Sequence, residues 1–416
     1  MKHLNSLAMA VAALSIGCGE ELTNPRPVGL SADAVKFGEA DASIRWNEIE
    51  RDLIVKHQPS QNAAVRQFAY LSLAQYNAVV AADDAEDNKE SEDTKHRSRH
   101  PSKHRSRHPS AQAAVAGASA AVLTYFYPDE QGFLDDQVHA QVSGRGHGSE
   151  RHSDVAAGEA MGRTVGAQVI ASARTDRFDA VWTGTVPVCP GCWHSNSPGL
   201  PPLLPLMGET RPFFMTTGSQ FRPAPPPAFG SPEFLAALAE VRYISDTRTA
   251  EQDRIAKFWA PGVGTSLVAG LWNGVATDLV VQFHQDERRA AHTLALMNMA
   301  ALDALIGSHD AKYTYWLIRP TQADPLITLA IGLPNHPSYP SNHAAFSTTV
   351  ALILGSIFPS ERNRLAAMAD EAGLSRIYGG IHYRFDKTGG EEIARKVSAL
   401  ALQLDVRGHR PFPVKP

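Results

Sequence analysis

The sequence predicts an all-α fold, a helical bundle with long proline-rich connections. Several long segments place apolar residues about 3.6 positions apart, which is the spacing of one helix face. No segment alternates apolar and polar residues with the period of two that marks a half-buried strand. Proline is concentrated in one region, since twelve of the residues from 181 to 232 are proline. That density forbids regular helix there.

The N-terminal half supplies the first predicted helices, in a helical region that spans residues 45–180. Apolar residues recur at helical spacing from the start of this region, and residues 63–80 are rich in alanine and leucine without proline or glycine. The helical pattern resumes over 111–127 and again over 131–173. These segments form the first half of the expected bundle.

One stretch of the N-terminal half cannot contribute to a core. An acidic run begins at Asp83, and it is followed by a tandem repeat of Lys-His-Arg-Ser-Arg-His-Pro-Ser over residues 95–110. A duplicated segment without apolar residues has nothing to bury. We therefore predict a disordered insertion over about 83–110.

The proline-rich stretch 181–232 reads as a long ordered loop laid over the helices. It contains Cys189 and Cys192, whose CxxC spacing fits a redox pair, half a zinc site or a disulfide. No second CxxC exists, so we expect a small disulfide that closes the loop. Helical pattern returns in the core region, residues 233–416, with helices expected at 232–244, 249–259, 265–283, 287–306, 344–358 and 361–373.

Charge and hydropathy exclude two classes of protein. The chain has 39 basic and 43 acidic residues and a net charge of −4, so it lacks the basic excess of a generic nucleic-acid binder. No uninterrupted apolar run reaches the length of a membrane span, which argues against a multi-span membrane protein.

The N-terminus resembles a targeting segment. A basic start is followed by about ten apolar residues, and the stretch ends in Gly17-Cys18. We predict a signal peptide over 1–18 with a possible lipobox, lipidation at Cys18, and a tether over 19–44. A plain secretory signal with an incidental cysteine is the alternative. The expected location is the periplasm, or the outer membrane or cell surface as a lipoprotein, with membrane contact only through the lipid anchor.

Three C-terminal segments carry the residues with chemical meaning. The first contains Lys312 and Arg319-Pro320, where a separation of seven would place both cations on one helix face. The second, Pro340-Ser341-Asn342-His343, runs into an apolar helix, whose free N–H groups suit an anion. The third runs from Ser375-Arg376 through a Gly-Gly break to His382. Two arginines, a lysine, a hydroxyl, helix-start amides and two histidines together suit a tetrahedral or trigonal-bipyramidal oxyanion.

These segments resemble the signature of the superfamily of type 2 phosphatidic acid phosphatases (PAP2) and vanadium-dependent haloperoxidases, which reads Lys-x6-Arg-Pro, Pro-Ser-Gly-His and Ser-Arg-x5-His. The glycine is replaced here by Asn342. Segments such as 221–227 and 256–259 resemble the bacterial haloperoxidase-like branch. The resemblance implies an all-helical fold and vanadate, or phosphate in the same site, as the bound oxyanion. It implies that His382 binds the central atom, that His343 is the acid or base, and that the oxyanion is bound by Lys312, Arg319, Ser341, Asn342 and Arg376.

Two chemistries are compatible with such a site, and they imply different partners. A haloperoxidase would use hydrogen peroxide to oxidise a halide that then reacts with a small organic substrate. A phosphatase would hydrolyse a phosphate monoester through a phosphohistidine. The soluble helical N-terminal half and the proline-rich loop favour the peroxidase. His336 stands at a position where, by the resemblance, the residue influences which halide is oxidised, and a histidine there resembles bromide- or iodide-selective members. A surface lipoprotein that binds oxyanions without turnover is the third possibility.

The partners of the two catalytic histidines are less defined in the sequence. A histidine bound to a metal-like centre usually has its other ring nitrogen held by a carbonyl or a carboxylate. Asp386, Asp303 and Glu251 are the candidates, and Asp386 lies four residues after His382.

Overall fold

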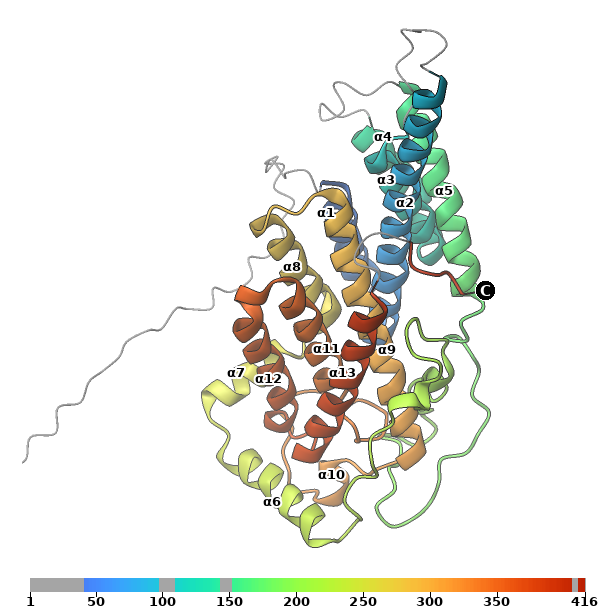
Figure 1. The fold of residues 1–416 in the computed structure, drawn as a ribbon. Coiled ribbons are helices and arrows are strands. Elements are labelled where there is room, and N and C mark those ends of the chain that lie inside the picture. The colour runs from blue at the N-terminus through green and yellow to red at the C-terminus, as the bar shows by residue number, and fades with distance from the viewer. Residues whose placement is uncertain (1–40, 97–108, 143–151, 406–410, 416) are drawn as a thin grey trace, which may run out of the picture. The chain divides into compact units, whose positions relative to one another are not determined.

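The structure is a computed structural model that describes residues 41–96, 109–142, 152–405 and 411–415. Its regular elements in these ranges are helices (Figure 1), apart from a single bridge between Cys192 and Leu317. The predicted all-α fold is therefore confirmed. The predicted signal peptide, Cys18 and most of the tether and of the tandem repeat lie outside the described residues.

Five helices form the N-terminal half: α1 (Asp41–His57), α2 (Gln61–His96), α3 (Ala111–Phe126), α4 (Gln131–Val142) and α5 (His152–Arg174). Helices α3 and α5 pack very closely because glycines recur every four residues along α5. A Cβ atom on Gly162 would lie 1.9 Å from the carbonyl oxygen of Ala114, so only glycine allows this approach.

The C-terminal half contains the helices that surround the predicted site: α6 (Pro232–Thr247), α7 (Ala250–Phe258), α8 (Leu267–Gln282), α9 (Glu287–Tyr315), α10 (Pro320–Ala323), α11 (Asn342–Ile357), α12 (Arg362–Tyr378) and α13 (Arg384–Leu404). Helix α9 packs against α2 of the N-terminal half and against α11 and α13 of its own half. By length and composition α9 would be long enough to cross a membrane, but 94% of its apolar stretch is buried inside the protein, as in the core helix of a soluble fold.

Buried polar contacts join the two halves. Asn47 of α1 donates to Asn273 of α8 at 2.8 Å, and Asn298 of α9 donates to Asn273 and to Ser72 of α2. At the N-terminal end of α9, the Glu287 carboxylate accepts from the backbone N–H groups of Ala42 and Ser43. Buried amides must be paired to be tolerated, so these contacts fix one mutual packing of the halves.

Some helix boundaries differ from the prediction. Helix α2 continues to His96, so the expected break at Asp83 was wrong. Alanine, glutamate and lysine propagate a helix that is already formed, and an acidic composition alone does not end it. Helix α9 extends past Gly307 to Tyr315, and α13 was not expected. Its Gly389-Gly390 pair resembles a helix break, but the glycines allow close packing: a Cβ atom on Gly390 would lie 2.6 Å from the carbonyl oxygen of Ser341.

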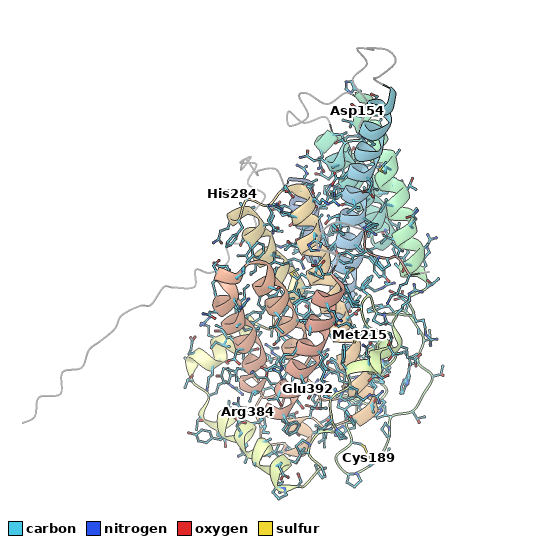
Figure 2. The ribbon with its side chains drawn as sticks, in the orientation of Figure 1. Asp154, Cys189, Met215, His284, Arg384 and Glu392 are labelled. Carbon is cyan, nitrogen blue, oxygen red and sulfur yellow. A yellow bond between two sulfur atoms is a disulfide. The ribbon has the colours of Figure 1, made fainter. Side chains whose placement is uncertain are left out.

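The connection from α5 to α6 follows the surface with two short 3-10 turns, Met207–Glu209 and Gly218–Phe221. Asp303 of α9 holds it by accepting from the N–H groups of Phe213, Phe214 and Met215 at 2.7–2.9 Å. Figure 2 labels Met215 and Cys189 on this connection. Cys189 and Cys192 form a disulfide, and their loop pairs with the segment that precedes Arg319.

Candidate active site

A cavity of about 160 Å³ brings the second and third predicted segments together. His336, Asn342 and His343 line it from the second segment, and Arg376 and His382 line it from the third. Ser60, in the turn between α1 and α2, and Gln61 and Asn62, at the start of α2, also line the cavity, so the N-terminal half forms part of the wall. Lys312 and Arg319 lie directly behind this lining, because both contact the segment 336–340. All three segments therefore converge on one place.

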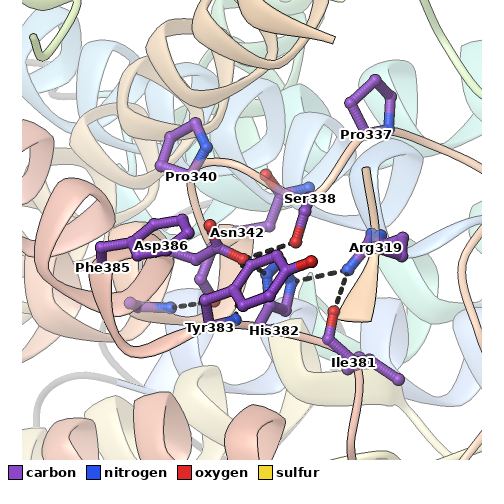
Figure 3. Close-up of polar contacts among 12 residues, drawn as sticks. Arg319, Pro337, Ser338, Pro340, Asn342, Ile381, His382, Tyr383, Phe385 and Asp386 are labelled. Atoms are coloured by element: carbon purple, nitrogen blue, oxygen red, sulfur yellow. Dashed lines mark hydrogen bonds and ion pairs between the residues drawn. The ribbon is translucent and has the colours of Figure 1, made fainter. Parts of the chain in front are cut away.

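His382 has a defined tautomer. Its Nδ1 lies 2.7 Å from Oδ2 of Asp386, and its Nε2 lies 3.1 Å from a terminal nitrogen of Arg319 (Figure 3). Guanidinium groups only donate, so Nε2 must accept and the ring proton must be on Nδ1. Burial lowers the pKa of His382 well below its ordinary value, and the nearby Arg319 and Lys312 lower it further. The imidazole is therefore neutral, and the lone pair of Nε2 becomes available to an electrophilic atom when the bond from Arg319 is released.

Asp386 is the carboxylate that orients His382, as the sequence suggested. The same oxygen also accepts from the Ser338 hydroxyl at 2.5 Å and from the Tyr383 N–H at 3.1 Å. The residue stands in the first turn of α13, where the helix dipole favours negative charge. Its pKa is nevertheless raised to about 6 by burial, although the Ser338 hydrogen bond and Lys312 oppose the shift.

Arg319 reaches the site by a route that the sequence did not indicate. Helix α9 ends at Tyr315 because Trp316 adopts a left-handed conformation, and Arg319 follows in extended backbone. The expected two-turn helical spacing from Lys312 was therefore wrong. The guanidinium is fully buried and donates to the carbonyls of His336 and Ile381 as well as to two imidazoles. Its bonds join the second and third segments.

Lys312 occupies a cage of backbone oxygens. Its ammonium donates to the carbonyls of Pro337 at 3.1 Å, Ser338 at 2.9 Å and Pro340. An ammonium has three N–H donors, so these bonds use all of them. Lys312 thus orders the loop before Ser341 and contributes positive charge to the site, and a direct bond to an oxyanion would require one carbonyl to be released.

The end of α7 positions Arg376 and His343. The carbonyl of Ala256 accepts from Arg376 at 2.9 Å, and the carbonyl of Trp259 lies 2.8 Å from Nε2 of His343. A carbonyl can only accept, so His343 carries its proton on Nε2 and leaves Nδ1 free to take up another. Burial and the neighbouring Arg376 lower the pKa of His343 well below its ordinary value. The resemblance had singled out the segment 256–259, but only the structure shows its role.

Ser341 and Asn342 begin α11 as predicted. The Ser341 hydroxyl accepts from the N–H of Ala344 and caps the helix, so it is engaged in a local bond. The amide of Asn342 is turned toward α9, where its oxygen accepts from Ser308 at 2.7 Å and its nitrogen donates to His309 at 3.1 Å. The side chain that replaces glycine therefore points along the cavity wall.

His336 lies in the same cavity, beside the two catalytic candidates. Its Nδ1 is 3.0 Å from the second terminal nitrogen of Arg319 and also 3.0 Å from the carbonyl oxygen of Pro337. Burial lowers the pKa of His336 well below its ordinary value, and Lys312 and Arg319 add to the shift. It is a neutral ring that is fixed by the same arginine as His382.

The site has buried positive charge in excess. Lys312, Arg319 and Arg376 are at most 3% exposed, and within the described residues their hydrogen bonds go to carbonyl, hydroxyl and imidazole groups. Desolvation lowers the pKa of Arg319 to about 10 and of Arg376 to about 9. Asp386 is the carboxylate close to Lys312 and Arg319. Because buried charges are costly unless compensated, this donor set fits a bound oxyanion such as vanadate or phosphate.

Two of the predicted supporting carboxylates lie elsewhere. Glu251 is exposed and pairs with Arg254 one turn along α7, which is the ordinary role of a surface charge. Asp303 is buried, but its oxygens hold the proline-rich connection. Among the described residues, no group of three or more His, Cys, Asp or Glu side chains could hold a metal ion.

Several residues of the site were not predicted. The Ser338 hydroxyl donates to Asp386. Ser308 and His309 contact the side chain of Asn342 directly, and Asn62 contacts His309. Ser338 lies between the Lys312–Pro320 and Pro340–His343 motifs, so its place in the sequence could have marked it as a candidate site residue. Asn62 is 280 positions from Asn342, and no local pattern connects the two.

Comparisons with known proteins agree with this geometry. Residues 292–407 match the family described as the PAP2 superfamily. Residues 292–407 are therefore a PAP2 superfamily region. The predicted recognition is thereby confirmed, and the match contains all three motif segments.

Two acid phosphatases are similar in sequence to part of the chain. The non-specific acid phosphatase of Providencia stuartii is 27% identical over 177 residues, which cover 41% of this chain and 68% of that protein. The non-specific acid phosphatase of Salmonella typhi is 39% identical over 71 residues, which cover 16% of this chain and only 28% of that relative's length.

Two haloperoxidases are similar in fold over most of the chain. A bacterial vanadium-dependent iodoperoxidase superposes with a TM-score of 0.71 at 22% identity, covering 88% of this chain and 95% of that one. A bacterial vanadium-dependent chloroperoxidase superposes with a TM-score of 0.63 at 14% identity, covering 92% and 96%. At these identities the likeness concerns the fold, and it covers about nine tenths of the chain.

Proposed function

We propose that this protein is a vanadate-dependent haloperoxidase that oxidises a halide with hydrogen peroxide. The observation that carries the choice is the contribution of the N-terminal half to the site, since Ser60, Gln61 and Asn62 close the cavity. The haloperoxidases share this two-part architecture over about nine tenths of both chains. The matches to acid phosphatases, in contrast, cover at most 41% of this chain.

The residues present fit vanadate. Nε2 of His382 would be its ligand, while Arg319, Arg376 and the N–H groups at the start of α11 would neutralise its oxygens. When bound, vanadate would activate hydrogen peroxide for the two-electron oxidation of a halide, in which the halide gives up two electrons and the peroxide is reduced to water. Asp386 keeps the proton of His382 on Nδ1, and His343 accepts or returns a proton through Nδ1. Beside them, the neutral ring of His336 favours bromide or iodide over chloride in this proposal.

The test is halide-dependent bromination of a phenolic dye after the protein has been loaded with orthovanadate. We expect activity with bromide and iodide, and its loss in His382→Ala. Glu251→Gln is the matched control, because Glu251 lies on the surface away from the cavity and should leave the rate unchanged. If vanadate-loaded wild-type protein halogenates the dye with neither bromide nor iodide while vanadate binding is intact, the peroxidase is ruled out.

A second function is supported by the sequence similarity to acid phosphatases. In this alternative, His343 first takes up a proton on Nδ1 from the monoanion of a phosphate monoester. Nε2 of His382 then attacks the phosphorus, the bond to the leaving oxygen breaks, and His343 gives that oxygen the proton. Water then cleaves the phosphorus–nitrogen bond and releases orthophosphate. Release of orthophosphate that depends on His382 and is blocked by vanadate would support it. Binding of oxyanion without either activity would leave a non-catalytic binding protein.

We also propose that the protein is exported and anchored through a lipid on Cys18. The support is the apolar N-terminal stretch that ends at Gly17-Cys18. Mass spectrometry of the membrane fraction should find an acylated Cys18 as the first residue. Full-length protein with an unmodified Met1 would refute the proposal.

A further inference from the structure

The side chain of Asn342 has a fixed orientation in the cavity wall. It stands where the superfamily signature has glycine, and its amide is held at both ends. Ser308 donates to Oδ1 at 2.7 Å, and Nδ2 donates to Nε2 of His309 at 3.1 Å. Two fixed partners leave the amide one rotamer, so it is a permanent part of the wall.

The same histidine also holds a second amide, from the other half of the molecule. Nδ2 of Asn62 lies 3.2 Å from Nε2 of His309, which therefore accepts from two amides. Burial lowers the pKa of His309 to about 3, so the ring is neutral and keeps this acceptor. Asn62 and Asn342 both line the cavity, and His309 joins them from behind.

The cavity is so small that the position of these two amides limits which ligands can enter it. Its volume is about 160 Å³, and an engineered protein cavity of about 150 Å³ is known to hold one benzene molecule. An oxyanion at His382 already occupies much of such a space. A further ring attached to it would have to extend past the two amides or over the apolar side chains of Val268 and Phe346.

We infer that Asn342 and Asn62 form an amide wall that restricts this site to small oxyanions and excludes those that carry an aromatic ring. The inference rests on the proposed oxyanion site and adds its substrate class: ligands the size of orthophosphate, methylphosphonate or a peroxide-bearing oxyanion. The glycine of the signature would leave this side open. Asn342 is thus a specificity-determining residue that sets an upper limit on ligand size.

The test compares the affinities of methylphosphonate and phenylphosphonate by calorimetry, with orthophosphate as the reference ligand. In the wild type we expect phenylphosphonate to bind at least about tenfold more weakly than methylphosphonate. Asn342→Gly should reduce that ratio by about tenfold, because the wall is removed. Asn62→Ala should shift it in the same direction from the opposite half of the molecule. Leu352→Ala, at an exposed position of α11, is the matched control and should leave the ratio unchanged.

The possible outcomes separate the two proposals. If orthophosphate binds but neither Asn342→Gly nor Asn62→Ala changes the ratio, the amide wall is refuted and the oxyanion site stands. If the wild type binds no orthophosphate, the oxyanion site fails and the inference fails with it. Thermal unfolding of each variant shows whether the protein is folded, and agreement between the two variants guards against a local collapse at either position.

Discussion

At the scale of single residues, the site is defined by which groups can donate and which can accept. Arg319 forces Nε2 of His382 to be an acceptor, and the carbonyl of Trp259 forces Nε2 of His343 to be a donor. Both rings are neutral, and the nitrogen that lacks a proton is Nε2 in the buried His382 but Nδ1 in the partly buried His343. One is suited to bind a central atom and the other to move a proton.

The substitution Asp386→Asn should separate two roles of Asp386: orienting the His382 ring and contributing a negative charge to the site. The amide retains the shape of Asp386, but it no longer holds the Nδ1 proton of His382 with a full negative charge, so turnover should fall about 10- to 100-fold. Orthophosphate affinity should be retained or increased, since the variant removes an anion from a site with excess positive charge. Calorimetry and initial rates measure the two effects. Asp370→Asn, on the surface, is the control, and a parallel loss of affinity and turnover would contradict this role.

Much of this residue-level picture was readable in the sequence, because motif spacing preserves chemistry. Lys312, Arg319, His343, Arg376 and His382 all meet at the site. The remainder depends on contacts that local pattern does not encode. The direction of Asn342 is set by Ser308 and His309, more than thirty positions earlier, and the path of Arg319 follows from the left-handed turn at Trp316.

At the scale of elements, several of the reactive side chains lie on short segments between helices. Contacts with the helices and with other loops fix the position of those segments. The loop of Cys189 and Cys192 is one such support. Trp193 donates its N–H to the carbonyl of Trp316 at 2.6 Å, and Ile318 donates to the carbonyl of Gly191 at 2.9 Å. These bonds flank Leu317, two positions before Arg319. The disulfide loop therefore fixes the backbone from which this arginine extends.

Replacing both cysteines with serine should affect stability and binding together. In the chain-entropy picture, a bridge that closes so short a loop contributes about 2 kcal/mol to the free energy of unfolding. Denaturant titration should show a loss of this size. Orthophosphate affinity should fall several-fold in the same variant, because Arg319 loses part of its support. Unchanged affinity at reduced stability would show that the loop does not position the arginine.

At the scale of the whole molecule, the two halves act as one folded unit with the cavity at their junction. Asn47, Asn273 and Asn298 link the halves through buried amides, and residues 60–62 close the site. The sequence predicted both helical halves. It did not predict that the first half would take part in the site, because the motifs all lie in the second.

The pH dependence of folding should reflect the buried histidines 309, 336 and 382 and the partly buried His343. Their pKa values are lower in the folded protein than the ordinary value of 6.5, chiefly because burial disfavours the charged ring. Above pH 6.5 each ring is neutral in both states and contributes no pH dependence. Below it the unfolded chain takes up protons that the folded protein does not, so stability falls by up to about 1.4 kcal/mol per pH unit for each histidine.

The buried carboxyl groups have the opposite effect on folding stability, over a lower pH range. Asp303 and Asp386 have pKa values raised to about 6 from 3.8, so the folded state binds their protons more tightly and gains stability as the pH falls from 6 toward 4. His336→Gln isolates one imidazole, since the amide oxygen can still accept from Arg319. Chemical unfolding from pH 7 to 5 should give a shallower loss for this variant than for the wild type, and equal slopes would refute the assignment.

The uncompensated positive charge behind His382 has a practical consequence for handling the protein. Cells and common buffers contain millimolar phosphate, so a site that binds tetrahedral anions, as proposed, would be filled before purification begins. Preparations would then differ in apparent activity according to their history, and the speed at which the resident anion departs would govern how quickly an added one takes effect.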